Sequence, residues 1–305
     1  MLEVLKNLSI LISKDFRYFL FTLLSLFTKA FGIILFIFFG FNYTLKSSVI
    51  IESNSEKYTF IGNSLVANNI YDKEANSIRN FGLEGELYYW SKFKVQHLLS
   101  NRTISGDTVF LEVTSNQFQS NVNPLTQNKI NGFLPRYMPF MSWKDVLKIF
   151  RDSRTLFFYR GLKRSLFWNI NTIRHHGFKW KSVFGGYKEK EGSHIVDKNL
   201  FSSSPAGQLD WNNVNLKAFL ETITLLESKG YIVCYFFSPK PLSNQEYWNN
   251  SNVATIELLK SIGKNDNLIR HNYEYLPDSM FADKWHLNKT GAKYFTQKFM
   301  EFLRE

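Results

Sequence analysis

The sequence is poor in cysteine and histidine, the residues that supply disulfides and most structural metal sites. It has one cysteine, Cys234, so no disulfide can form within the chain. Its six histidines are scattered and form no Cys/His cluster with zinc-finger spacing. We therefore expect a fold that is stable without disulfides or a structural metal, and we predict no metal site and no cofactor.

Disordered and collagen-like chains are excluded by composition, because hydrophobic residues make up 44% of the chain and charged residues 21%. Aromatic residues are frequent, with 30 Phe, 15 Tyr and 7 Trp among 305 residues. That length allows one principal domain with a packed core and an accessory piece. The formal net charge of +11 attracts anionic partners in general and identifies none.

A long apolar run lies near the N-terminus. Residues 16–41 include nine phenylalanines, and Lys29 is the only charge between Tyr18 and Phe41. A transmembrane helix needs about 20 apolar residues, so residues 1–45 are predicted to form an interfacial segment and an N-terminal transmembrane helix. A cleaved signal peptide is the alternative. The run is longer than the apolar region of a signal peptide, and no small-x-small cleavage site follows it before Lys46.

The charges around this run predict its orientation. Three cations against two carboxylates precede it, which favours a cytoplasmic N-terminus. We therefore expect a single-pass protein of the bacterial cytoplasmic (inner) membrane, with residues 46–305 outside. Lys29 lies within the apolar run, where a charge costs at least about 2.5 kcal/mol. Its ammonium group either snorkels to the interface or meets a second membrane protein.

Residues 46–305 alternate short apolar runs with amphipathic patterns. Helices are predicted over 84–100, 215–229 and 289–302, the second ending at Gly230 and the third capped by Asn288. This alternation is typical of α/β proteins, and we expect a three-layer α/β/α sandwich with a mostly parallel sheet. Ligands of such sheets bind beyond the carboxyl ends of the strands. The predicted strands are 57–61, 77–81, 108–114 and 231–237.

The segment between the predicted strands 108–114 and 231–237 is far longer than a strand-helix-strand unit needs. We therefore expect an inserted lobe at about residues 120–208. Residues 144–198 hold 13 Lys or Arg against 5 Asp or Glu, interleaved with Phe and Trp. Such a stretch can stack nucleobases, rest on an anionic membrane surface, or enclose its own aromatic core. Outside the cytoplasm we expect no nucleic acid partner. Membrane lipid and a self-contained core remain as alternatives.

Two segments carry residues suited to acyl chemistry. FIGNSLVANNI, residues 60–70, ends an apolar strand at Gly62 and places Ser64 at a helix start, where backbone N–H groups can stabilise an oxyanion. In FADKWHLN, residues 281–288, Asp283 and His286 lie three residues apart. This spacing lets the carboxylate accept Nδ1–H of the imidazole, leaving Nε2 to take a proton from a hydroxyl. Each segment also has a plainer explanation, an N-cap serine or a polar surface loop.

Two further segments follow predicted strands directly. Asn116 comes after the strand 108–114, where its side-chain amide could donate to an oxyanion. In NFGLEGE, Asn80 and Gly85 follow another strand, and Gly85 offers an unhindered backbone N–H. Taken singly, each is ordinary turn chemistry.

Together and in this order, the four segments resemble the SGNH hydrolase superfamily. Its members carry Gly-Asp-Ser, Asn-x-x-x-x-Gly, Gly-x-Asn and Asp-x-x-His blocks, and here residues 62–64, 80–85, 114–116 and 283–286 occupy those places. The resemblance implies a flavodoxin-like SGNH fold. It covers about residues 57–116 and 210–305 and leaves the insert without a counterpart.

The resemblance also implies roles for individual residues. Ser64 becomes the nucleophile, His286 the base and Asp283 the residue that orients it. The oxyanion hole is then formed by the backbone amides of Ser64 and Gly85 with the Asn116 side chain. Asn63 and Asn80 support the site. Asn63 stands where the family usually has Asp, and Thr114 where it usually has Gly.

The apolar N-terminal run makes the chain similar to the membrane-anchored branch that assists O-acylation of cell-envelope polymers, as in teichoic acid D-alanylation and alginate or peptidoglycan acetylation. This similarity implies a serine O-acyltransferase or O-acylesterase acting on a cell-envelope glycan or lipid-linked polymer. A multispanning membrane-bound O-acyltransferase (MBOAT) is the implied protein partner. The alternative is a catalytically silent scaffold that binds glycan or such a partner.

Overall fold

The structure is a computed structural model in which the chain divides into two compact units, residues 1–48 and 49–305. Each unit is described by itself. The described residues are 14–48, 56–73, 77–104, 106–119, 121–153, 164, 184–192, 210, 213–269 and 274–304.

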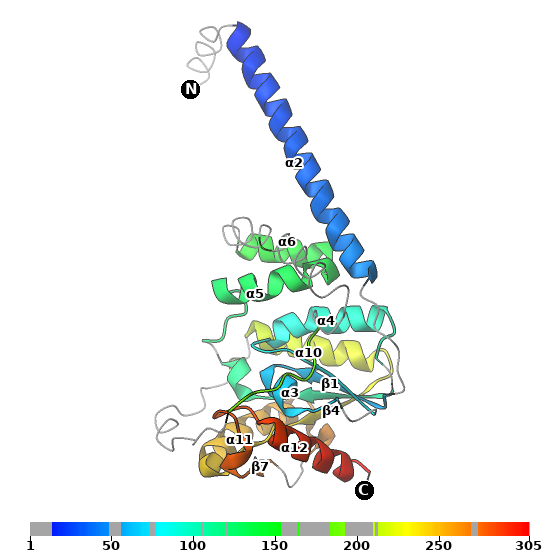
Figure 1. Cartoon of the computed structure of the whole chain (residues 1–305), viewed down its shortest axis with the longest axis vertical. Coiled ribbons are helices and arrows are strands. Elements are labelled where there is room, and N and C mark those ends of the chain that lie inside the picture. The colour runs from blue at the N-terminus through cyan, green and yellow to red at the C-terminus, as the bar shows by residue number, and fades with distance from the viewer. Residues whose placement is uncertain are drawn as a thin grey trace. The chain divides into compact units, whose positions relative to one another are not determined.

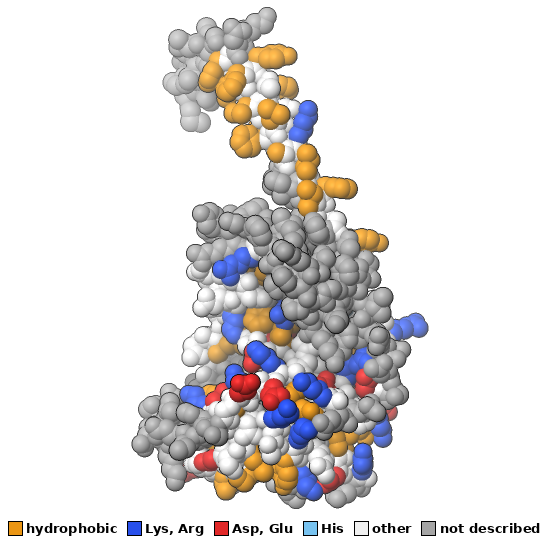
Figure 2. All heavy atoms as spheres, viewed as in Figure 1, with side chains coloured by type: hydrophobic (Ala, Val, Ile, Leu, Met, Phe, Trp, Pro, Cys, Tyr) orange, Lys and Arg blue, Asp and Glu red, His pale blue; other side chains and the backbone are white. Residues whose placement is uncertain are grey.

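The described part of the first unit is the helix α2 (Lys14–Ser48), which has 35 residues. Apolar side chains follow its length (Figure 2), and Phe19, Leu24, Phe27 and Phe36 are exposed. Within the described residues, no helix meets both the length and the apolarity that a membrane span requires. The transmembrane anchor therefore stays a prediction, and the segment ahead of residue 14 lies outside the described residues.

The second unit is built on a five-stranded sheet in the order β2-β1-β3-β4-β6, joined throughout by parallel pairings. The predicted α/β class and mostly parallel sheet are thus confirmed. The four predicted strands all form, with ends shifted by at most two residues. The sheet strands are β1 (Tyr58–Gly62), β2 (Ile78–Gly82), β3 (Thr108–Glu112), β4 (Ile232–Phe236) and β6 (Leu268–Ile269).

The helices α4 (Tyr88–Ser100) and α10 (Val214–Glu227) lie on one side of this sheet, and α12 (Lys289–Phe302) lies on the other (Figure 1). The core on the α12 side is aromatic. The ring of Phe60 from β1 lies 4.8 Å from that of Phe110 and 5.8 Å from that of Phe299 in α12. Buried rings of this size dominate the hydrophobic stabilisation of a core.

The helix termini follow local chemistry. Asn288 caps α12, since its Oδ1 accepts the Gly291 N–H at 2.9 Å. By contrast, α4 begins at Tyr88 and not at the predicted residue 84. The residues before it form a turn in which Gly85 has φ of +70°, a conformation that interrupts a helix.

Several elements were not predicted from the sequence. After β4 come the short strand β5 (Lys240–Pro241), the helix α11 (Gln245–Ser261) and β7 (Tyr275–Leu276), which pairs with β5. Strands of only two residues, such as β5 and β7, are too short to show a hydrophobic period in the sequence.

The insert contributes α5 (Gln127–Tyr137) and α6 (Trp143–Asp152), the latter capped by Ser142, whose Oγ accepts the Asp145 N–H at 3.2 Å. Its chain returns to the sheet at residues 184–192. Most of the basic aromatic stretch between these parts, 154–163 and 165–183, lies outside the described residues, so its predicted membrane contact stays a prediction.

Candidate active site

The candidate site lies at the carboxyl edge of the sheet, at the point where strand order reverses. From β1 the chain moves to β2 on one side and then to β3 on the other. In open parallel sheets, ligands bind outside the strand ends at this reversal. The helix α3 (Ser64–Asn69) follows β1 directly, and Asn116 lies in a short 3₁₀ helix (Ser115–Phe118) that follows β3.

The structure brings Ser64, His286 and Asp283 together in one hydrogen-bonded series. His286 Nε2 lies 3.0 Å from Ser64 Oγ, although 222 positions separate the two residues in the chain. His286 Nδ1 lies 2.8 Å from Oδ2 and 2.9 Å from Oδ1 of Asp283. A proton held on Nδ1 by this carboxylate leaves the Nε2 lone pair directed at the serine hydroxyl. The arrangement is therefore suited to general-base activation of Ser64.

The Asp283–His286 loop is held rigidly by its own backbone. Phe281 and Leu287 form an antiparallel bridge and are fully buried. Asp283 Oδ1 accepts the backbone N–H of Trp285 at 2.8 Å and of His286 at 2.9 Å. These two backbone hydrogen bonds hold the carboxylate in place, in addition to its contact with the imidazole.

One hydrogen bond joins this loop to the helix of the nucleophile. The backbone N–H of Leu287 donates to Oδ1 of Asn69, the last residue of α3, at 2.9 Å. Ser64 and His286 are thus positioned by two elements that are bonded to each other.

The electrostatics of the site favour a neutral histidine. Burial lowers the pKa of His286, the Asp283 carboxylate opposes this, and the nearby cations Lys190 and Lys240 lower it further, with the net effect below the ordinary value. Burial alone would raise the pKa of Asp283, but hydrogen bonds from His286 and from the Trp285 backbone outweigh it and hold the pKa low. At neutral pH the pair is therefore an ionised carboxylate and an imidazole that can accept a proton.

Asn63 and Asn80 stabilise α3, the helix that begins at Ser64. Asn63 Oδ1 accepts the Leu65 N–H at 2.7 Å and so caps α3 without a charge. Asn80 Nδ2 donates to the carbonyl oxygens of Val66 and Ile70, and its Oδ1 accepts the Gly82 N–H at 2.6 Å. One buried amide thus joins β2 to α3.

The two other predicted oxyanion groups lie at the same edge of the sheet. The loop that carries Gly85 is joined to β1 by a hydrogen bond from Leu83 N–H to the Gly62 carbonyl at 3.1 Å. Asn116 Oδ1 is 3.4 Å from Gln119 Nε2. Within the described residues, neither Gly85 nor Asn116 is hydrogen-bonded to Ser64 or His286. The structure places them near the strand ends but does not by itself define an oxyanion hole.

A buried charged pair beside the site was missed by the sequence analysis. Glu112 ends β3 and Lys240 begins β5; both are buried, and Glu112 Oε2 and Lys240 Nζ have no hydrogen-bond partner among the residues that the structure describes. Burial raises the pKa of Glu112 and lowers that of Lys240. The ammonium lies 4.5 Å from the centre of the Trp248 ring and 5.8 Å from that of Trp285. Trp285 precedes His286, so Lys240 lies beside the Asp283–His286 loop.

A charge inside the apolar run TVFLEVT was the one sequence signal for Glu112. Nothing local distinguishes Lys240, because its burial arises from contacts with α11 and the 283–286 loop.

In the described ranges, no group of three or more His, Cys, Asp or Glu side chains could hold a metal ion. Comparison with protein-family models, with curated proteins and with solved structures finds no match to this chain.

Proposed function

We propose that this protein is a serine acyl-transfer enzyme of the SGNH type, an O-acyltransferase or O-acylesterase that acts through an acyl-serine intermediate. The observation that carries the proposal is the series Ser64 Oγ, His286 Nε2, His286 Nδ1 and Asp283 at 3.0 and 2.8 Å. Nucleophile and base within hydrogen-bond reach, with the base oriented by a third group, are the geometric signature of covalent acyl catalysis.

In the proposed first step, Ser64 Oγ attacks the carbonyl carbon of an acyl donor while His286 Nε2 takes the hydroxyl proton. The tetrahedral intermediate collapses when the bond to the donor oxygen breaks, and the imidazolium returns its proton to that oxygen. The second step repeats this chemistry with a new hydroxyl. His286 takes its proton, its oxygen attacks the acyl-serine, and Ser64 recovers the proton as it leaves.

The proposed oxyanion hole consists of the Ser64 and Gly85 backbone amides with the Asn116 side chain. These groups stand at adjacent strand ends, and an N–H aimed at the developing negative charge stabilises the transition state more than the ground state. Hydrolysis and transfer share all of these residues and differ only in whether water or a sugar hydroxyl resolves the intermediate.

The proposed setting is the outer face of a bacterial cytoplasmic membrane, with a cell-envelope glycan or lipid-linked polymer as acceptor and an MBOAT as the neighbouring donor protein. Support comes from the first unit, where large apolar side chains along α2 are exposed (Figure 2). Exposed apolar surface of this extent is stabilised by lipid or by a membrane partner. The parallel sheet and its reversal point are compatible with the proposed SGNH fold.

A serine-directed fluorophosphonate probe tests the proposal on the full-length protein in detergent. We expect labelling of the parent and a loss of about 10³-fold or more in Ser64→Ala, because Ser64 Oγ is the hydroxyl that lies 3.0 Å from His286 Nε2. Ser228→Ala, at the exposed end of α10, is the matched control and should label like the parent. Absence of labelling in the correctly folded parent would favour the silent scaffold.

A further inference from the structure

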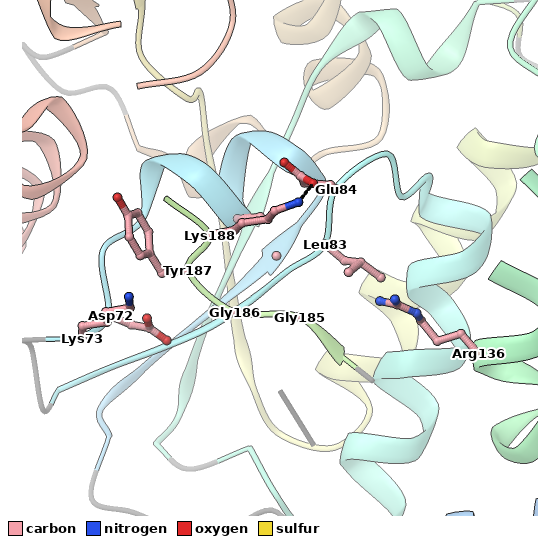
Figure 3. A pocket seen from close by; sticks show the side chains of 11 residues that line it. Asp72, Lys73, Leu83, Glu84, Arg136, Gly185, Gly186, Tyr187 and Lys188 are labelled. Atoms are coloured by element: carbon pink, nitrogen blue, oxygen red, sulfur yellow. Dashed lines mark hydrogen bonds and ion pairs between the residues drawn. The ribbon is translucent and has the colours of Figure 1, made fainter. Parts of the chain in front are cut away.

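The insert contributes no proposed catalytic group, but several of its residues line a cavity next to the candidate active site. The cavity has a volume of about 610 Å³. Its lining includes Ala67 of α3, the residues Gly82 to Glu84 at the end of β2, Arg136 of α5 and the returning segment Gly185 to Lys188. Figure 3 shows Tyr187, Asp72 and Lys73 at one end and Leu83 and Arg136 at the opposite end.

This cavity borders two of the elements that carry proposed catalytic groups, α3 and the loop that follows β2. Ala67 follows Ser64 by three positions in α3, and residues so spaced in a helix have Cβ atoms about 5–6 Å apart. Glu84 directly precedes Gly85, the proposed oxyanion donor. A molecule in the cavity would therefore lie close to the nucleophile.

The returning segment of the insert is fixed against the sheet. Gly186 N–H donates to the Gly82 carbonyl at 3.1 Å, and Lys188 N–H donates to the Ala67 carbonyl at 2.8 Å. Gly185 has φ of +92°, and a Cβ at this position would lie 2.0 Å from the Gly82 carbonyl oxygen. Only glycine allows so close an approach, so the returning segment is a fixed part of the cavity wall.

The helix α5 is fixed to the same loop by a buried polar network. Glu86 accepts hydrogen bonds from Lys94 at 2.6 Å, from Ser91 at 2.7 Å and from the Tyr137 hydroxyl of α5. Lys129 of α5 donates to the Gly85 carbonyl at 2.6 Å. The insert therefore holds both the cavity and the loop that follows β2.

The chemistry of the lining restricts the ligand. Leu83 and Ala67 are the only aliphatic side chains among the lining residues, which is too little apolar surface for an acyl chain. Three cations face two carboxylates, and Lys188 is already paired with Glu84 while Lys73 lies 5.4 Å from the centre of the Tyr187 ring. A densely anionic polymer would find little uncompensated positive charge.

We propose that this cavity binds the acceptor as a neutral, polyhydroxylated saccharide chain. Each sugar hydroxyl both donates and accepts hydrogen bonds, so mixed cations and carboxylates match it better than either charge alone. Tyr187 lies at one end of the cavity (Figure 3), and its half-buried ring supplies apolar surface for the C–H side of a sugar ring. This inference rests on the proposed acyl transfer for its biological meaning, but the binding itself can be measured separately.

The test is calorimetric titration of the full-length protein in detergent with chitotetraose and cellotetraose, and with an oligomer of glycerol phosphate as the anionic arm. We expect a neutral oligosaccharide to bind and to slow fluorophosphonate labelling of Ser64. Leu83→Trp, which fills the cavity from a half-exposed position, and Tyr187→Ala should each weaken binding by about tenfold or more. Ile232→Trp, an exposed position at the amino end of β4, is the matched control and should stay within about twofold.

The outcomes separate the two proposals. Saccharide binding that is lost in both cavity variants, with no labelling of Ser64, supports the cavity and refutes the acyl-transfer function. Labelling of Ser64 without saccharide binding, or with binding unchanged in both variants, overturns the cavity inference and leaves the function standing. Tighter, salt-sensitive binding of the glycerol phosphate oligomer also overturns it, because the site would then recognise anions.

Discussion

Replacement of Asp283 by asparagine tests the proposed mechanism at the point where the structure is most specific. Asp283 Oδ1 accepts two backbone N–H groups, from Trp285 and His286, at 2.8 and 2.9 Å. In Asp283→Asn these donors hold the amide oxygen in the place of Oδ1, so the amide NH₂ takes the place of Oδ2, the carboxylate oxygen that lies nearer to His286 Nδ1, at 2.8 Å. The imidazole would then accept a hydrogen bond at Nδ1 and carry its proton on Nε2, directed at the hydroxyl of Ser64.

The expected magnitude follows from restoring the productive tautomer. With Nδ1–H against the amide NH₂, two partly buried donors lose their acceptors, at about 2 kcal/mol each. The sum of about 4 kcal/mol corresponds to a rate loss of about 10³-fold, since each 1.4 kcal/mol is a factor of ten. Loss of the carboxylate charge that stabilises the imidazolium acts in the same direction.

The assay is the rate of fluorophosphonate labelling and of small acyl ester turnover at neutral pH, with thermal unfolding measured alongside. Asp278→Asn is the matched control, because Asp278 Oδ1 also accepts a backbone N–H, that of Ser243 at 3.2 Å, without contacting the imidazole. If Asp283→Asn reacts as fast as the parent while keeping its fold, Asp283 does not orient His286 and the proposed mechanism is wrong.

Three further predictions concern the oxyanion group, the pH dependence and stability. Asn116→Ala should lower kcat by about 10²–10³-fold with KM nearly unchanged; a change confined to KM would make Asn116 a substrate contact. The turnover rate should fall on acidification, with a midpoint below the ordinary histidine pKa. Lys240→Met should move that midpoint to higher pH, because removing a nearby cation favours protonated His286. A pH profile with the same midpoint in parent and variant contradicts this prediction. Lys94→Met should lower the free energy of unfolding by about 3–5 kcal/mol, because Glu86 stays buried without its cation, whereas Lys92→Met, which breaks a partly exposed pair, should cost about 0–1 kcal/mol in the same denaturant titration.

The parts of this protein that could be predicted from sequence depend on neighbours along the chain. Short runs rich in β-branched and aromatic residues located four sheet strands, because such side chains pack well within a buried sheet. Asn288 located the start of α12 because an N-cap acts within three residues. The Asp283–His286 pair was visible for the same reason, since both side chains belong to one short loop.

What the tertiary structure decided are contacts between residues that are far apart in the chain. The order of the four segments predicted Ser64 and His286 as partners, but only packing of α3 against the 281–287 loop places their side chains 3.0 Å apart. The burial of Lys240 beside Glu112, and the cavity between the insert and β2, likewise depend on which segments the parallel sheet brings to one edge. Local propensity cannot encode these positions, because each side chain is positioned by several elements whose packing is settled together.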